Sequence, residues 1–429
     1  MYRVHAIYTA GFCRLVDFPF KQSLAGWAAH DMIDRECGSS SGPDEVPAPD
    51  HILPAEEVFL DIDAGPGVAT SESALATAAP ARLPGPGIWE SVAWMTGVHV
   101  AQIAAGAAAA VLLIVAYLAT TGGDAIQKIL TTQAGRNAIT AEMGRFFTEN
   151  VIFLIAAAQL ATVVIGLAAI RLRFGRAGLS RLGWRLPAPG HWLMILLLVL
   201  PLWLLCSNLQ SRMFEWFPAS HMEMTELMKA MAGASLPALL FVIGAGPALG
   251  EELIFRGLIG RGLLARWGFV PGVLITSLLF GIMHVNPAQA IGVIPLGIAI
   301  HFLYLTTRSF WAPVALHLAN NSLSVILLKL EDDVPLGRLL DDGAPLPLHL
   351  FIASAATVIA IGLLLWQTRV QYRLSDGSFW SPGYVSAEAP PAEAGALPVR
   401  QDPRLLLLAG STINSLGFVA VLWRLVVAS

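Results

Sequence analysis

Long stretches without Asp, Glu, Lys or Arg most restrict how this chain can fold. From residue 91 onward they cover 91–123, 151–170, 186–211, 230–250, 267–307, 309–328, 343–368 and 405–423. A helix needs about 20 apolar residues to cross a bilayer, and 267–307 is long enough for two crossings, with Asn286-Pro287 as the break. Because backbone polar groups cannot stay unpaired in lipid, the spans should be helices. The sequence predicts an all-α bundle of about eight or nine transmembrane helices.

The composition excludes the common soluble classes. Of the 429 residues, 55% are hydrophobic and 13% are charged, whereas soluble domains carry about 25% charged residues. The formal net charge is −4, so no basic surface for nucleic acid is expected. Cys13, Cys37 and Cys206 share no metal-ligand spacing. The expected surroundings of the chain are therefore the lipid bilayer, with no nucleic-acid partner.

Composition also divides the chain into four regions. Residues 1–90 are acidic and rich in Pro, Ala, Ser and Gly, so they contain too little apolar surface to offset the entropy of ordering and are predicted to be disordered. Residues 91–230 are expected to hold the first transmembrane helices, 231–330 a functional core, and 331–429 the C-terminal helices and a linker.

The charged loops predict an orientation in the membrane. The loop after the second span is rich in arginine, with Arg171, Arg173, Arg176, Arg181 and Arg185. Positively charged loops stay in the cytoplasm, and placing this loop inside puts the N-terminus inside as well. The Ala-, Gly- and Arg-rich composition is compatible with a bacterial inner membrane.

Ionisable and amide side chains of the apolar region gather between Glu251 and Asn321. Such groups are costly inside a membrane, so a functional role is the default interpretation. Glu252 and Arg256 are four residues apart and can pair on one helix face, whereas Glu251 points about 100° away. Taken alone, this cluster could also be an interfacial charge patch that ends a span.

Two further polar groups follow on separate apolar stretches. His284 comes four residues after Phe280, and His317 comes four residues before Asn321. A single histidine could be a core residue, and a His/Asn pair could simply hold helices together. We interpret three other histidines as interfacial or core residues: His99, His191 and His301.

Spacing connects the first two groups. Arg266-Trp267-Gly268 and Pro271-Gly272 predict a tight turn between two helices. Glu251 lies 17 residues before Gly268 and His284 lies 16 residues after it, so at about 1.5 Å per residue the two side chains should reach similar depths. A carboxylate beside an imidazole suits the activation of water. Glu251, His284 and His317 would equally fit a catalytic zinc site, and the residues alone do not choose.

The ordered motifs E-E-x-x-x-R, F-x-x-x-H and H-x-x-x-N, over roughly residues 235–330, resemble the signature of the CAAX-protease and bacteriocin-processing family. The resemblance implies an integral membrane endopeptidase similar to type II CAAX prenyl endopeptidases. Such an enzyme would hydrolyse a peptide bond near the C-terminus of a membrane-associated or lipidated protein. Both metal-dependent and metal-free glutamate mechanisms are associated with the family; we favour no cofactor, and zinc stays an alternative.

The resemblance also implies roles for the motif residues. Glu251 and His284 would activate the attacking water, and His317 and Asn321 would stabilise the oxyanion. The supporting residues would be Glu252, Arg256 and Phe280. These side chains should line a polar cavity inside the helix bundle.

Two other functions remain compatible with the sequence. One is a non-proteolytic membrane protein, such as an immunity or scaffold protein. The other, less favoured, is a transporter, which would show broken helices in repeated halves, and no such repeat is visible. A zincin-type protease is disfavoured because the chain has no H-E-x-x-H motif.

Overall fold

The computed structural model describes residues 85–120, 127, 131–330, 347–380 and 395–396, all of which belong to one compact unit, Ala78–Ser429. The predicted span 405–423 and nearly all of the predicted disordered region lie outside the described residues. The few described residues before position 91 include the start of a helix at Ile88, slightly earlier than the composition indicated.

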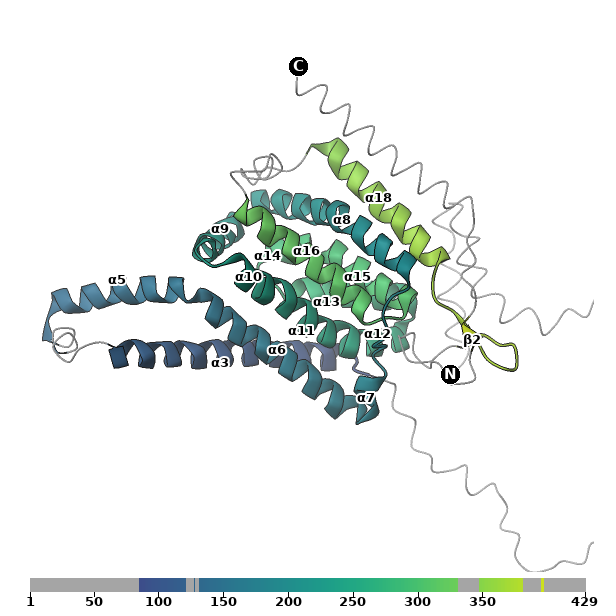
Figure 1. Ribbon diagram of the computed structural model, residues 1–429, viewed down its shortest axis with the longest axis horizontal. Coiled ribbons are helices and arrows are strands. Elements are labelled where there is room, and N and C mark those ends of the chain that lie inside the picture. The colour runs from purple at the N-terminus through teal and green to yellow at the C-terminus, as the bar shows by residue number, and fades with distance from the viewer. Residues whose placement is uncertain (1–84, 121–126, 128–130, 331–346, 381–394, 397–429) are drawn as a thin grey trace, which may run out of the picture. The chain divides into compact units, whose positions relative to one another are not determined.

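The described elements are almost entirely helical (Figure 1). In chain order they are α3 (Ile88–Thr120), α5 (Gln133–Glu149), α6 (Val151–Phe174), α7 (Ala177–Ser180), α8 (Pro189–Trp216), α9 (Pro218–Ala232), α10 (Leu236–Leu239), η1 (Leu240–Ala245), α11 (Gly246–Ile254), η2 (Phe255–Ile259), α12 (Gly260–Trp267), α13 (Phe269–Ile282), α14 (Pro287–Gly292), α15 (Ile294–Thr307), α16 (Trp311–Lys329) and α18 (Leu348–Gln367). A small antiparallel pair joins β1 (Tyr372–Arg373) to β2 (Gly395–Ala396).

The helices confirm an all-α polytopic membrane bundle. Six are long and apolar enough to cross a membrane: α3, α6, α8, the continuous helix Leu236–Trp267, α16 and α18. Helices α13 and α15 are also apolar but have only 14 residues each. These eight helices coincide with the uncharged stretches between residues 91 and 368. The chain also forms two polar helices, α5 and α9, which the search for apolar runs did not predict.

The break in the predicted double span forms as expected. Helix α12 ends at Trp267 and is followed by Gly268, whose φ of 76° lies in the left-handed region that favours glycine. Helix α13 then runs to Ile282, and Asn286 starts the short helix α14 by accepting a hydrogen bond from the Gln289 amide. The chain therefore returns through α15 as a second apolar helix.

Glu251 lies in the middle of a helix, and this position excludes the interpretation that its charge cluster ends a span. The helix that begins at Leu236 continues to Trp267. The segment with Glu251 and Glu252, α11, lies between two π-helical segments, η1 and η2. Single π-turns inside α-helices are frequent at functional sites. The charged residues thus lie deep in the bundle, where their charges must be paired.

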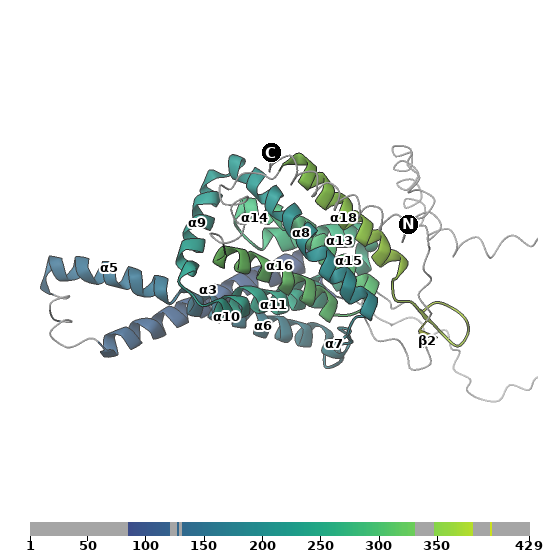
Figure 2. The same ribbon diagram turned by 45° about the horizontal axis from the view of Figure 1, so that its top comes forward.

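Close packing of small residues holds this long helix against α6. Helices α11 and α6 are neighbours, as are α3 and α6, α8 and α18, and α13 and α15 (Figures 1 and 2). A Cβ atom on Gly250 would lie 3.0 Å from Thr162 of α6, and one on Gly257 would lie 2.7 Å from Ile170. Glycine therefore permits an approach that larger residues would prevent.

Replacing Gly257 by leucine is expected to destabilise the protein by about 1–3 kcal/mol, since the new side chain would overlap Ile170 and Leu182. Thermal unfolding of the purified protein in detergent measures the effect. Gly106→Leu is the matched control, because a Cβ at Gly106 on α3 has no neighbour within 4 Å. Equal unfolding temperatures for the two variants would contradict this packing.

Candidate active site

A buried ionic cluster joins α11, η2 and α16. Glu252 Oε1 accepts from Arg256 Nη1 at 3.0 Å and from His317 Nδ1 at 2.9 Å. The side chains of Glu252 and Arg256 are 0% exposed and that of His317 is 2% exposed. Buried charges persist only when they are paired and hydrogen-bonded. One carboxylate oxygen therefore fixes both a guanidinium and an imidazole.

Arg256 extends this cluster to two more helices. Its Nη2 donates to the carbonyl of Gly297 on α15 at 2.8 Å. Its guanidinium also lies 5.2 Å from the centre of the Phe280 ring on α13, a distance suited to a cation–π contact. Together, Arg256 and Glu252 thus connect the helices that carry all three sequence motifs.

The orientation of His317 follows from its partner. Glu252, paired with Arg256, is an acceptor, so His317 Nδ1 must carry the hydrogen that it donates. His317 Nε2 then faces Glu251, whose Oε2 lies 4.0 Å away. In a neutral His317, this nitrogen is a proton acceptor.

Glu251 is partly exposed, whereas the Glu252 side chain is 0% exposed, although each has one buried Oε2 without a hydrogen-bond partner among the described residues. Among the described residues, no group donates to Glu251 Oε2, although this atom is buried. Its side chain as a whole is 13% exposed. The separation of 4.0 Å from His317 Nε2 is too long for a direct hydrogen bond, and one water molecule can contact both atoms. This arrangement suits a general base, Glu251, that shares a water molecule with the imidazole of His317.

His284, like His317, packs against the Phe280 ring. The ring centre of Phe280 is 5.2 Å from His284 and 5.7 Å from His317, and both contacts are edge-to-face. His284 Nδ1 lies 3.0 Å from the Phe280 carbonyl, to which it donates. Among the described residues, no hydrogen bond or ion pair joins His284 to Glu251. The imidazole next to Glu251 is that of His317, and a direct role for His284 stays a prediction.

Asn321, on α16, contacts the long helix Leu236–Trp267 near the start of that helix. Its Nδ2 donates to the carbonyl of Ile243 in η1 at 3.1 Å, which leaves its second N–H available. Asn320 is buried, and its Oδ1 has no hydrogen-bond partner among the described residues. The role of Asn321 at an oxyanion stays a prediction.

A metal site does not fit this arrangement. Within the described residues, no group of three or more His, Cys, Asp or Glu side chains converges as metal ligands would. Of the set considered from the sequence, His317 lies 4.0 Å from Glu251, whereas no contact among the described residues joins His284 to either of them. The described side chains therefore offer no complete ligand set for a catalytic metal.

Among the described residues, three histidines outside the motifs are buried or partly buried, as predicted for them: His99, His191 and His301. His191 is buried and its Nε2 contacts the carbonyl of Thr368 at 2.9 Å, while His99 contacts Gln102. His301 is fully buried one turn after Gly297, and the absence of a side chain at Gly260 makes room for its ring. The sequence did not reveal the backbone contact of Gly297 with Arg256, because a carbonyl acceptor has no residue signature.

Comparison with family models points to this same region. Residues 233–323 match the family model described as type II CAAX prenyl endopeptidase Rce1-like. A Bacillus subtilis (strain 168) protein described as "Putative membrane peptidase YdiL" is 34% identical over 98 residues, which are 23% of this chain and 39% of that protein. The match thus covers well under half of either chain. No solved structure matches this chain significantly. The comparisons confirm the resemblance to the CAAX-protease and bacteriocin-processing family for the helices that hold Glu251, His284 and His317.

Proposed function

We propose that the chain is an integral membrane endopeptidase of the CAAX-protease type. It hydrolyses a peptide bond near the C-terminus of a membrane-associated or lipidated protein. The observation that carries the proposal is the buried Glu251 Oε2, which has no described hydrogen-bond partner and lies 4.0 Å from His317 Nε2. It supports the proposal because it lies within the region that matches the family model.

In this mechanism Glu251 is the general base. A water molecule beside its Oε2 attacks the carbonyl carbon of the scissile bond while Glu251 takes one of the water protons. The carbon–nitrogen bond then breaks, and the proton passes from Glu251 to the leaving amine. No covalent bond between enzyme and substrate is needed.

His317 and its partners stabilise the negative charge that develops on the carbonyl oxygen of the substrate. Glu252 accepts the Nδ1 hydrogen of His317 and thereby fixes the orientation of the imidazole, with Nε2 toward Glu251. When Nε2 carries a hydrogen it can donate to the oxyanion, together with the second N–H of Asn321. His284, whose Nδ1 is engaged by the Phe280 carbonyl, would hold the water through Nε2. Arg256 is a positioning residue, because it fixes Glu252 and does not reach the reacting atoms.

The experiment that tests this function compares membranes of cells that carry either the wild type or Glu251→Gln. New protein C-termini are identified by mass spectrometry. The proposal predicts at least one membrane-associated protein with a C-terminus that appears only with the wild type. Identical C-termini, combined with a cellular phenotype shared by both forms, would instead support a scaffold or immunity role.

The proposed mechanism also predicts resistance to chelators. Incubation with 1,10-phenanthroline should leave the cleavage of that substrate unchanged, because the described side chains form no three-ligand group. Loss of activity that is restored by added zinc would overturn the metal-free mechanism. That result would contradict the metal-free mechanism but not the proposed peptidase function.

A further inference from the structure

His301 is a buried histidine that the proposed mechanism does not use. It lies on α15 and is 0% exposed, and among the described residues neither its Nδ1 nor its Nε2 has a hydrogen-bond partner. An imidazole without hydrogen bonds is costly in the interior of a protein, because it loses its contacts with water and gains none in return. The ring therefore requires a hydrogen-bonding partner close by.

Two contacts between helices place His301 beside Arg256. Arg256 Nη2 donates to the carbonyl of Gly297 at 2.8 Å, and Gly297 lies one helical turn before His301 on α15. A Cβ on Gly260, which lies one turn after Arg256, would be 3.1 Å from His301 Nε2. The guanidinium of Arg256 is also close enough to act electrostatically on the His301 ring. The two side chains are therefore neighbours between α15 and the long helix Leu236–Trp267.

Arg256 has one N–H group that its other contacts do not use. Its Nη1 donates to Glu252 and its Nη2 to Gly297, whereas its Nε is buried and has no partner in the part of the chain that the structure describes. A guanidinium can only donate, and a neutral imidazole has one donor and one acceptor nitrogen. The Nε hydrogen of Arg256 and the acceptor nitrogen of His301 are therefore complementary.

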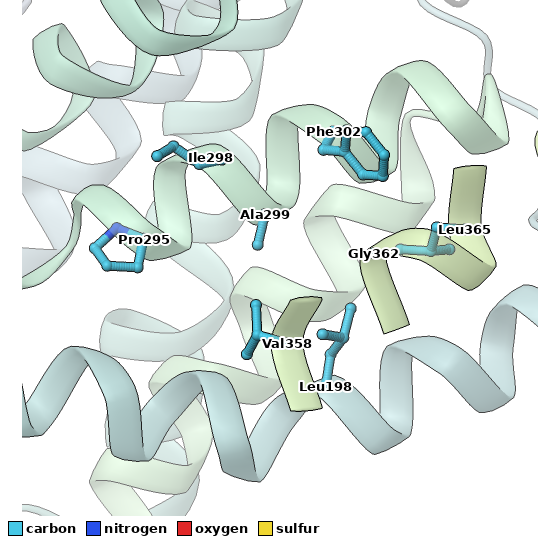
Figure 3. Close-up of a pocket in the computed structure, with 8 residues that line it drawn as sticks. All are labelled: Leu198, Pro295, Ile298, Ala299, Phe302, Val358, Gly362 and Leu365. Carbon is cyan, nitrogen blue, oxygen red and sulfur yellow. The ribbon is translucent and has the colours of Figure 1, made fainter. Parts of the chain in front are cut away.

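The apolar pocket on another side of α15 offers no alternative partner. It lies between α8, α15 and α18, and Figure 3 shows its lining side chains, which include Ile298 and Phe302 but not His301. All of the lining residues are apolar, so the pocket supplies no side-chain hydrogen bond. Arg256 is the polar side chain that the contacts place beside the His301 ring.

We propose that His301 is a positioning residue that holds Arg256 through one buried water molecule. No direct hydrogen bond joins the two side chains, so the bridge requires a water. The water accepts the Nε hydrogen of Arg256 and donates to the acceptor nitrogen of His301. Buried water molecules typically join polar groups that would otherwise lack partners, and a bridging water is nearly as favourable in enthalpy as a direct hydrogen bond.

The bridge would restrain all three nitrogens of the guanidinium. Arg256 in turn fixes Glu252, which accepts the Nδ1 hydrogen of His317. His301 thus acts on the candidate active site only through Arg256 and Glu252 and does not contact the reacting atoms. This effect on catalysis rests on the proposed function, whereas the bridge itself does not.

A double-mutant cycle on the purified protein in mixed micelles tests the bridge without any substrate. Arg256→Lys keeps a cation that can pair with Glu252 but lacks an Nε–H group. We expect His301→Phe to raise the equilibrium constant for unfolding about fivefold more in the wild-type background than in Arg256→Lys, because the effects of interacting residues are not additive. Effects that agree within about twofold would overturn the proposal.

A second buried histidine provides the matched control. His191 Nε2 contacts the carbonyl of Thr368, so His191→Phe should have the same effect on unfolding in both backgrounds.

Activity distinguishes positioning from packing alone. His301→Phe is expected to lower kcat about fivefold with KM nearly unchanged, because Glu252 would be held less firmly against His317. His301→Gln, which supplies a donor and an acceptor, should restore kcat. A glutamine variant that restores stability but not kcat would overturn the positioning role. Absence of cleavage by the wild type would instead refute the proposed function, and the double-mutant cycle would still decide on the bridge.

An experimental structure of the wild type that resolves ordered water tests the bridge directly, whether or not the variants fold. We expect one water molecule within about 2.7–3.2 Å of both Arg256 Nε and a ring nitrogen of His301. A structure without a water molecule at that position would contradict the proposal.

Discussion

Replacing Glu251 by glutamine is expected to lower the rate of peptide hydrolysis by about 10²–10⁴-fold. Glutamine keeps the size of the side chain but cannot accept the proton of the attacking water. Little stability should be lost, because Glu251 Oε2 has no hydrogen-bond partner among the described residues. Initial rates on the substrate identified from the new C-termini would measure the effect, with kcat reduced and KM nearly unchanged.

The neighbouring carboxylate provides a matched comparison. Glu252→Gln keeps Glu251 as the base but weakens the contacts with Arg256 and His317. It should therefore reduce both stability and activity, whereas Glu251→Gln reduces activity alone. A Glu251→Gln enzyme that hydrolyses the substrate at the wild-type rate would exclude Glu251 as the base.

Replacing Arg256 by leucine is expected to lower the free energy of unfolding by about 3–5 kcal/mol. The substitution leaves the buried Glu252 carboxylate without its guanidinium and removes the link to the Gly297 carbonyl. Denaturant titration of the purified protein in mixed micelles measures the change. Activity should fall as well, because Glu252 would no longer be held against His317.

Two controls distinguish charge pairing from packing. The double variant Glu252→Leu/Arg256→Leu should recover part of the stability, since it removes both buried charges, but it should remain inactive. Arg171→Leu, on the exposed surface of α6, should stay within about 0.5 kcal/mol of the wild type. If Arg256→Leu were as stable as Arg171→Leu, the buried pair would not hold the bundle together.

Much of the fold was predictable because a bilayer imposes a simple rule on sequence. Uncharged stretches of sufficient length marked the helices from α3 to α18, and Gly268 and Asn286 marked the breaks. Helices α5 and α9 were missed because their own residues include charged groups and form no long apolar run. The uncharged stretch 230–250 did not mark the full length of its helix, which continues to Trp267, because the buried Glu252 and Arg256 pair with each other and with His317 on α16.

The candidate site was predictable in its members and less so in its contacts. Helical spacing correctly paired Glu252 with Arg256. It also suggested His284 as the imidazole beside Glu251, whereas the described contact is with His317. Spacing gives depth along a helix but not its rotation or tilt, and the π-helical segments on both sides of α11 change that rotation. The sequence therefore indicated which residues form the candidate site, but not how their side chains contact one another.

Hydrolysis in isotopically labelled water tests the central claim most directly. Membranes from cells with Glu251→Gln supply uncut substrate, and purified wild type, Glu251→Gln or Arg171→Gln is added in H₂¹⁸O. We predict new C-termini that carry ¹⁸O with the wild type and with Arg171→Gln, and none with Glu251→Gln. The same labelled C-termini with all three proteins would contradict a peptidase that depends on Glu251.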